Sequence, residues 1–261
     1  MRKILLTSVG VAALAVSANA TDFTLSGTAK VKVDDNGDTS VDVSTAVGVS
    51  KTFDNGMVLS LSNNNMGNAG ELTLTSDAVA ITFGDFDQNE KAPGLNGDAA
   101  SSDIKSDGVA HGDDNTSSGA ISLGATVAGV GIGAAMNNDG DTMFGGSFTS
   151  DIGGMSVTIG GDVFTDDNSS LDQTTMGIKA GLGALTVVAH SKQVEAAAGT
   201  DTVSYSAAYT TGGLVIGFQG DDADKSSYSA TYTVVPGMQF EIGSLDNGTT
   251  STSSAELQMT F

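Results

Sequence analysis

Carboxylates are the groups in this sequence best suited to chemistry, and they are concentrated between residues 85 and 118. A segment with many carboxylates and few bases can attract cations, bind a divalent metal or activate water beside a histidine. Each possibility demands a different spacing. The acidic residues that we take as candidates are Asp85, Asp87, Glu90, Asp98, Asp103 and Asp107.

The histidines do not indicate an enzyme. The chain has two, His111 and His190. The run His111-Gly112-Asp113-Asp114 places carboxylates beside a histidine, as a water-activating site requires. However, a segment this rich in aspartate places acids near any residue. We therefore expect no catalytic activity and no catalytic residues.

Three short acidic stretches resemble calcium-binding loops superficially. They are DDNGD (34–38), NNDGD (137–141) and DDADK (221–225). None has the twelve-residue spacing with a closing glutamate that a calcium loop of the EF-hand type needs. We expect no cofactor, and loose binding of Ca²⁺ or Mg²⁺ by acidic outer loops remains open.

The elements that must position these residues are β-strands. Apolar residues alternate with polar ones along the chain, for example Ala255, Leu257, Met259 and Phe261 against Glu256, Gln258 and Thr260. Residues 119–136 carry no charge and could be read as a membrane-spanning helix. Their apolar phase slips at Ala128-Gly129, however, which predicts a hairpin of two strands.

The alternation predicts sixteen strands, with tight turns and longer polar connections following one another in turn. The spacing is roughly 13 residues per strand and connection, against the 9–11 that a membrane-spanning strand needs. Fourteen or eighteen strands remain open. This rhythm is typical of an all-β, closed antiparallel barrel that crosses a membrane.

The two faces of the strands favour lipid on one side and water on the other. The apolar positions hold a single charge, Lys51, whereas the opposite positions hold Lys30, Lys32, Asp42, Asp162, Lys179, His190, Glu241 and Glu256. A lysine or arginine at the bilayer midplane costs about 2–4 kcal/mol, so its rarity on a lipid-facing side is expected. A soluble sandwich would also alternate, but it does not explain so long an uninterrupted series of strands.

The first twenty residues read as a secretory signal peptide. Arg2 and Lys3 precede an apolar run, and Ala18-Asn19-Ala20 forms a small-residue cleavage site. Residues 21–261 would be the mature barrel. The formal net charge is −21, and losing Arg2 and Lys3 would make it −23. Such a charge repels nucleic acid and favours small cations. The absence of cysteine excludes a disulfide framework.

The chain resembles the general diffusion porins of Gram-negative outer membranes, in particular those of alphaproteobacteria. The resemblance rests on the rhythm of strands and turns, on the terminal Phe261, and on AVAITFGDFD (78–87), in which Phe-Gly-Asp leads into a long third outer loop. It implies a homotrimer in the outer membrane through which small hydrophilic solutes and ions diffuse passively. It also implies that the third loop, residues 85–118, folds into the lumen as a constriction.

The resemblance assigns roles to individual residues. The six candidate acids would form the acidic side of the constriction, and Lys30 and Lys32 would be the basic side on the opposite wall. The porin pattern has several arginines there, whereas residues 21–261 contain none. Cation preference is therefore expected. Phe261 would be the C-terminal signal for the outer-membrane assembly machinery. The alternative is a secreted or surface acidic β-rich structural or adhesion protein.

Overall fold

The chain forms a closed antiparallel barrel, as the alternation predicts. The computed structural model describes residues 21–63, 70–87, 118–167, 172–195 and 201–261. The expected signal peptide and most of the expected constriction loop lie outside these ranges. None of the described residues belongs to a helix with the length and hydropathy of a membrane span.

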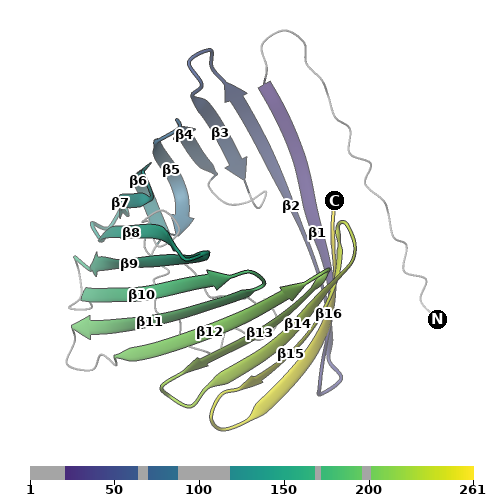
Figure 1. Ribbon diagram of the computed structural model, residues 1–261. Helices are drawn as coiled ribbons and strands as arrows, with labels where there is room; N and C mark the ends of the chain where they lie inside the picture. Colours follow the sequence, from purple (N-terminus) through teal and green to yellow (C-terminus); the bar gives the residue numbers. More distant parts are fainter. Residues whose placement is uncertain (1–20, 64–69, 88–117, 168–171, 196–200) are drawn as a thin grey trace.

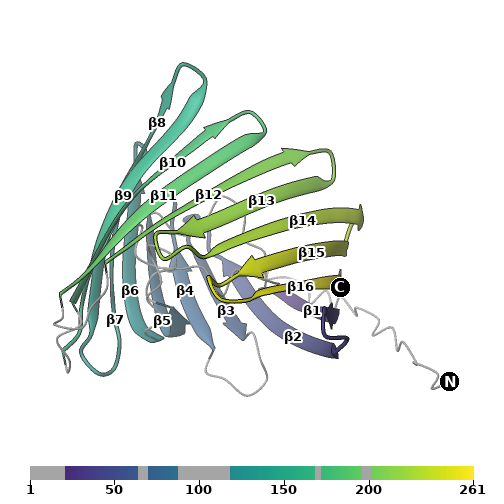
Figure 2. The same cartoon turned by 90° about the horizontal axis from the view of Figure 1, so that it is seen from below.

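Sixteen strands occur within the described ranges, the number predicted, and Figures 1 and 2 show them as one ring from two directions. The strands are β1 (Thr21–Asp34), β2 (Thr39–Thr52), β3 (Val58–Asn63), β4 (Glu71–Thr75), β5 (Val79–Asp87), β6 (Ser118–Val127), β7 (Val130–Met136), β8 (Thr142–Ile152), β9 (Met155–Thr165), β10 (Asp172–Leu182), β11 (Leu185–Glu195), β12 (Thr202–Thr211), β13 (Leu214–Asp221), β14 (Ser226–Val235), β15 (Met238–Asp246) and β16 (Ser251–Thr260). Each strand pairs with its neighbours along the chain, and β1 pairs with β16.

The connections at one end of the barrel are tight. Two residues join each of the pairs β6–β7, β8–β9, β10–β11, β12–β13 and β14–β15. In the first of these, Ala128 and Gly129 both have positive φ angles, 52° and 82°. Two such residues give the turn whose twist matches that of a two-stranded hairpin. The hairpin predicted from the phase slip at this position is confirmed.

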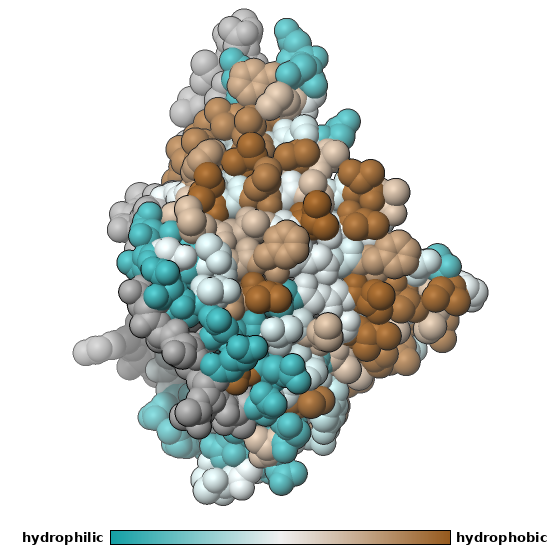
Figure 3. All heavy atoms as spheres, turned by 90° about the vertical axis from the view of Figure 1, so that its left-hand side faces the viewer, coloured by the Kyte–Doolittle hydropathy of each residue, from teal (hydrophilic) through white to brown (hydrophobic). Residues whose placement is uncertain are grey.

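Alternation along each strand separates the side chains into two populations. On β10, Met176, Ile178 and Leu182 are 67%, 47% and 58% exposed, while Thr175, which precedes Met176, is 5% exposed. Apolar side chains gather in a broad band on the outer surface (Figure 3). The polar population lines the inside. This distribution is the reverse of that in a water-soluble protein, where large apolar side chains are buried.

The lysine on the apolar side has an aromatic neighbour. The Nζ atom of Lys51 lies 5.6 Å from the centre of the Phe53 ring, within the range of a cation–π interaction. Lys51 is the penultimate residue of β2, and Phe53 directly follows the strand. The charge is therefore placed at the margin of the apolar band, where a long side chain can reach water.

The expected boundaries of the long third loop need correction. The alternation stops after Gly84, but β5 continues to Asp87, and β6 begins at Ser118. The register of β5 against β6 shifts between Phe83 and Phe86. Gly84, in this interval, has a φ of 123°, which favours glycine. An extra residue in one strand interrupts the period of two without ending the strand, so pattern alone reads it as a loop.

The barrel closes where the last residue meets β1. The backbone amide of Gly27 donates a hydrogen bond to the Phe261 carbonyl at 2.8 Å, and the amide of Phe261 donates to the Gly27 carbonyl at 2.9 Å. A Cβ atom on Gly27 would lie 2.6 Å from Cε2 of the Phe261 ring. The ring therefore covers the glycine, and only a residue without a side chain fits beneath it.

We predict that Gly27→Ala weakens this closing seam. The added methyl group would displace the Phe261 ring, and overpacking of this kind costs about 1–3 kcal/mol. Thermal unfolding in detergent micelles should report the loss. Gly146→Ala is the matched control on β8, because a Cβ there would meet its nearest atom, the Gly131 carbonyl oxygen, at an ordinary 3.5 Å. Equal unfolding temperatures for the two variants would contradict the seam as described.

Candidate functional site

The inner wall of the barrel is polar, as expected. Its buried polar residues come from nearly all the strands between β5 and β16. They are Thr82, Ser122, Asp162, Thr175, His190, Ser204, Ser206, Gln219, Asp221, Ser227, Ser254 and Glu256. Asp162, His190 and Glu256 are among those predicted for the polar side of the strands, and this placement is confirmed.

The inner wall differs in exposure from one side of the barrel to the other. On β1, the side chains of Lys30, Lys32 and Asp34 are 26%, 28% and 34% exposed. On β11 and β12, His190 and Ser204 are each 2% exposed. The polar positions of β2, β3 and β4 are half-buried or exposed. The polar positions of β1 to β4 are therefore more exposed than those of His190 and Ser204.

The two lysines expected on the basic side both point inward, but each has an acidic partner. Nζ of Lys30 lies 3.6 Å from Oε1 of Glu256, and Nζ of Lys32 lies 3.7 Å from Oδ1 of Asp34. Glu256 is directly opposite Lys32 in the pairing of β1 with β16. Lys30 and Glu256 stand at opposite ends of the chain, and only the pairing of β1 with β16 brings them together.

Most of the expected acidic constriction falls outside the described residues. Glu90, Asp98, Asp103 and Asp107 lie in the segment 88–117. The backbone of Asp85 and Asp87 belongs to β5, and the position of their side chains is not described. The role of these six residues, and the folding of the third loop into the lumen, thus remain predictions.

An acid that sequence reasoning missed lies on the same wall. Glu71, at the start of β4, is half-buried, and its Oε1 accepts a hydrogen bond of 3.0 Å from the Thr73 hydroxyl. The Thr73 hydroxyl is also 3.2 Å from that of Thr82 on β5. Because Leu72 and Leu74 mark the outer side of β4, the alternation places Glu71 inside and could have identified it.

His190 packs tightly against its neighbours on the inner wall. It faces Gly177 on β10 and Ser204 on β12. A Cβ on Gly177 would overlap the imidazole ring, so the glycine provides the space for it. Neither Nε2 of His190 nor Oγ of Ser204 has a hydrogen-bond partner. The cross-strand pair therefore lacks the hydrogen bond through which a histidine activates a hydroxyl.

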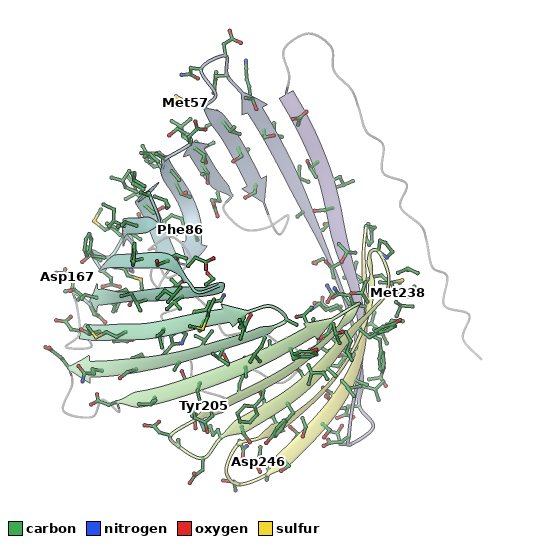
Figure 4. The ribbon with its side chains drawn as sticks, in the orientation of Figure 1. Met57, Phe86, Asp167, Tyr205, Met238 and Asp246 are labelled. Carbon is green, nitrogen blue, oxygen red and sulfur yellow. The ribbon has the colours of Figure 1, made fainter. Side chains whose placement is uncertain are left out.

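An apolar cluster also lies on the inner wall, contrary to expectation. Ala135, Met143 and Phe164 are direct cross-strand neighbours on β7, β8 and β9, and they cluster with Phe86. Their exposures are 5% or less, and Figure 4 shows Phe86 on the inner side of the ribbon. Met143 lies inside because Phe144, Gly146 and Phe148 occupy the outer positions of β8.

The acidic turns use their side chains to hold the backbone. Oδ1 of Asn137 accepts hydrogen bonds from the amides of Asp139 and Asp141, at 2.9 and 2.8 Å. Oδ1 of Asp221 accepts from Ala223 and Lys225, both at 2.9 Å. In the part of the chain that the structure describes, no group of three or more acidic or histidine side chains could hold a metal ion. Loose divalent binding therefore remains an untested expectation.

Among the comparisons with known proteins, only the comparison of structures gives matches. No family model matches the sequence, and no curated protein does. Solved structures do match. Two variants of the porin from Rhodopseudomonas (Rh.) blastica give TM-scores of 0.64 and 0.62 at 13% identity. A structure titled "Asymmetric conductivity of engineered proteins" gives 0.64 at 13%. Each comparison covers 93% of this chain and 100% of the other.

The chain has the fold of a porin. Agreement over the whole length of the compared chains, with the same closed barrel, supports this in spite of the low identity. The porin fold places Lys30, Lys32 and Glu256 on the inside, and it places the apolar band on the outside. The polar inner wall is thus the inner wall of a porin-like barrel.

We predict that Met143→Ala destabilises the barrel by about 2–5 kcal/mol, because it leaves a cavity in a packed apolar cluster. Unfolding by urea in detergent micelles would measure the loss. Met176→Ala is the matched control, since Met176 is 67% exposed on the outer surface, whereas Met143 is 1% exposed. If Met143→Ala lowers the free energy of unfolding no more than Met176→Ala does, Met143 is not packed in an apolar cluster.

Proposed function

We propose that this chain is an outer-membrane channel of a Gram-negative bacterium, through which small hydrophilic solutes and ions diffuse passively. The observation that carries the proposal is the division of the closed barrel into an apolar outer band and a polar inner wall. A bilayer can solvate the first, and water can occupy the space along the second. The proposed partners are outer-membrane lipid and the permeating solutes.

The alternative, a secreted or surface adhesion protein, fits the exposed apolar side chains poorly. Exposed residues include Phe144 (62%), Met176 (67%) and Tyr228 (59%), on β8, β10 and β14. Soluble monomers rarely expose continuous apolar surface of more than a few hundred Å². An adhesin of this design would aggregate in water, so nothing in the structure favours that function.

Cation preference is part of the proposal. The formal net charge of −21 produces a negative potential that concentrates cations at the barrel mouths. On the inner wall, each of the two candidate basic residues lies beside a carboxylate. Acidic side chains around a pore with few bases favour cations.

The remaining parts of the proposal follow from the resemblance to porins. They are assembly into a homotrimer, export by the signal peptide at residues 1–20, and recognition of Phe261 by the assembly machinery. In the structure the Phe261 side chain is 43% exposed while its backbone is bonded to Gly27. A ring that covers the closing seam on its outer side is compatible with a role in assembly.

Recording across a planar lipid bilayer tests the function. Purified protein should produce stepwise current increases as barrels insert. With a KCl gradient, the reversal potential should have the sign of a potassium-preferring pore. A protein that binds the bilayer without any current would remove the channel proposal, and a chloride-preferring potential would remove the cation preference alone.

The acidic constriction has its own test. Replacing Asp85 and Asp87 with Asn and Glu90 with Gln should lower the ratio of potassium to chloride permeability, because three negative charges leave the narrowest part of the path. A matched triple variant, Asp54→Asn, Asp77→Asn and Asp151→Asn, removes the same charge at the other end of the barrel. Asp54 and Asp77 are exposed in connections between strands, and Asp151 is exposed at the end of β8. If both triple variants change the ratio equally, the third loop does not form the constriction.

A further inference from the structure

Charged residues gather on the inner wall around the closing seam. Six inward positions lie close together on β15, β16, β1 and β2, through strand pairing or through neighbouring inward positions along β1. We call them the seam cluster: Lys30, Lys32, Asp34, Asp42, Glu241 and Glu256. Glu256 faces Lys32 on one side and Glu241 on the other, and Lys30 faces Asp42. The cluster thus contains both candidate basic residues of the pore wall.

Glu256 holds the central place in this cluster. It is 6% exposed, and Lys30, whose side chain is 26% exposed, reaches it across the seam at 3.6 Å. Lys32 has Asp34 at 3.7 Å. Four carboxylates and two ammonium groups give the seam cluster a formal charge of −2. The wall expected to be basic is therefore acidic in sum.

We propose that Glu256 determines ion preference by cancelling the charge of Lys30 on the pore wall. This inference rests on the proposed channel function and extends it to a residue outside the third loop. A lysine paired at 3.6 Å acts on a passing ion as one half of a dipole, whose field falls off faster with distance than that of a single charge. The net formal charge of −2 on the seam cluster makes this wall attractive to cations.

The size of the effect can be estimated from Coulomb's law. In lumen water, a single charge about 7 Å from an ion changes its energy by roughly RT, which corresponds to about a threefold change in local ion concentration. Salt in the lumen reduces this further. Removing the negative charge of Glu256 beside Lys30 should therefore lower the potassium-to-chloride permeability ratio by about two- to threefold.

A purely structural role for the ion pair makes a different prediction. Because Lys30 lies on β1 and Glu256 on β16, the pair could serve only to tie the closing seam. Loss of such a tie would lower the unfolding temperature without changing ion preference. The permeability ratio is a readout that this role would leave unaltered.

The experiment is bilayer recording of Glu256→Gln in a KCl gradient. The ratio should fall about two- to threefold at similar conductance, as estimated for the loss of one negative charge. Glu195→Gln is the matched control, because Glu195 is exposed at the end of β11 on its outer positions. The double variant Lys30→Gln/Glu256→Gln again has a cluster charge of −2, and its ratio should return close to that of the unaltered protein.

Three results would overturn the inference. The ratio could stay unchanged in Glu256→Gln, it could fall equally in Glu195→Gln, or it could stay low in the double variant. If Glu256→Gln does not insert, Glu256→Ser gives the same readout with a residue type that is common on this wall. Absence of current from the unaltered protein would instead refute the channel function, so the two failures are distinguishable.

Discussion

Closure of the sheet is the constraint on which the rest of this structure depends. An open sheet has edge strands with unpaired backbone groups, which hydrocarbon cannot satisfy. Pairing of β1 with β16 removes both edges, and the reciprocal hydrogen bonds of Gly27 and Phe261 complete it. Once the ring is closed, every side chain must point either into it or out of it. The chemistry of each position then follows from its parity along the strand.

The two populations have opposite solvent requirements. Polar residues such as Thr82, Ser204 and Gln219 are buried inside, whereas Leu123, Phe144 and Tyr228 are exposed outside. In water this arrangement would destabilise the protein, by roughly 25 cal/mol for each Å² of apolar surface left in contact with water. A bilayer reverses the sign for the outer surface. The inverted distribution is therefore a physical reason to place the barrel in lipid, independent of any likeness to known structures.

The inner wall is divided into regions of different character. Met143, Phe164 and Phe86 form a dry apolar cluster on β5 to β9, and His190 and Ser204 form a tightly packed polar region further round. The charged and more exposed residues lie around the seam. Lys30 and Lys32 are half-buried there, and each has an acidic partner.

The sequence by itself determined the fold class, the number of strands, and the side on which Lys30, Lys32, His190 and Glu256 lie. These features depend on a period of two and on turn residues, which are local properties of the chain. Its error was local too, because the bulge after Phe83 looked like the start of a loop.

Only the tertiary structure decided which residues meet. The pairing of Lys30 with Glu256, the row from Ala135 to Phe164, and the cover of Phe261 over Gly27 depend on the register between strands. Register is a relation between segments, and in the first and last cases these segments are separated by nearly the whole chain. A pattern read along one strand contains the parity of a residue but not its partner, since the partner exists only once the ring has closed.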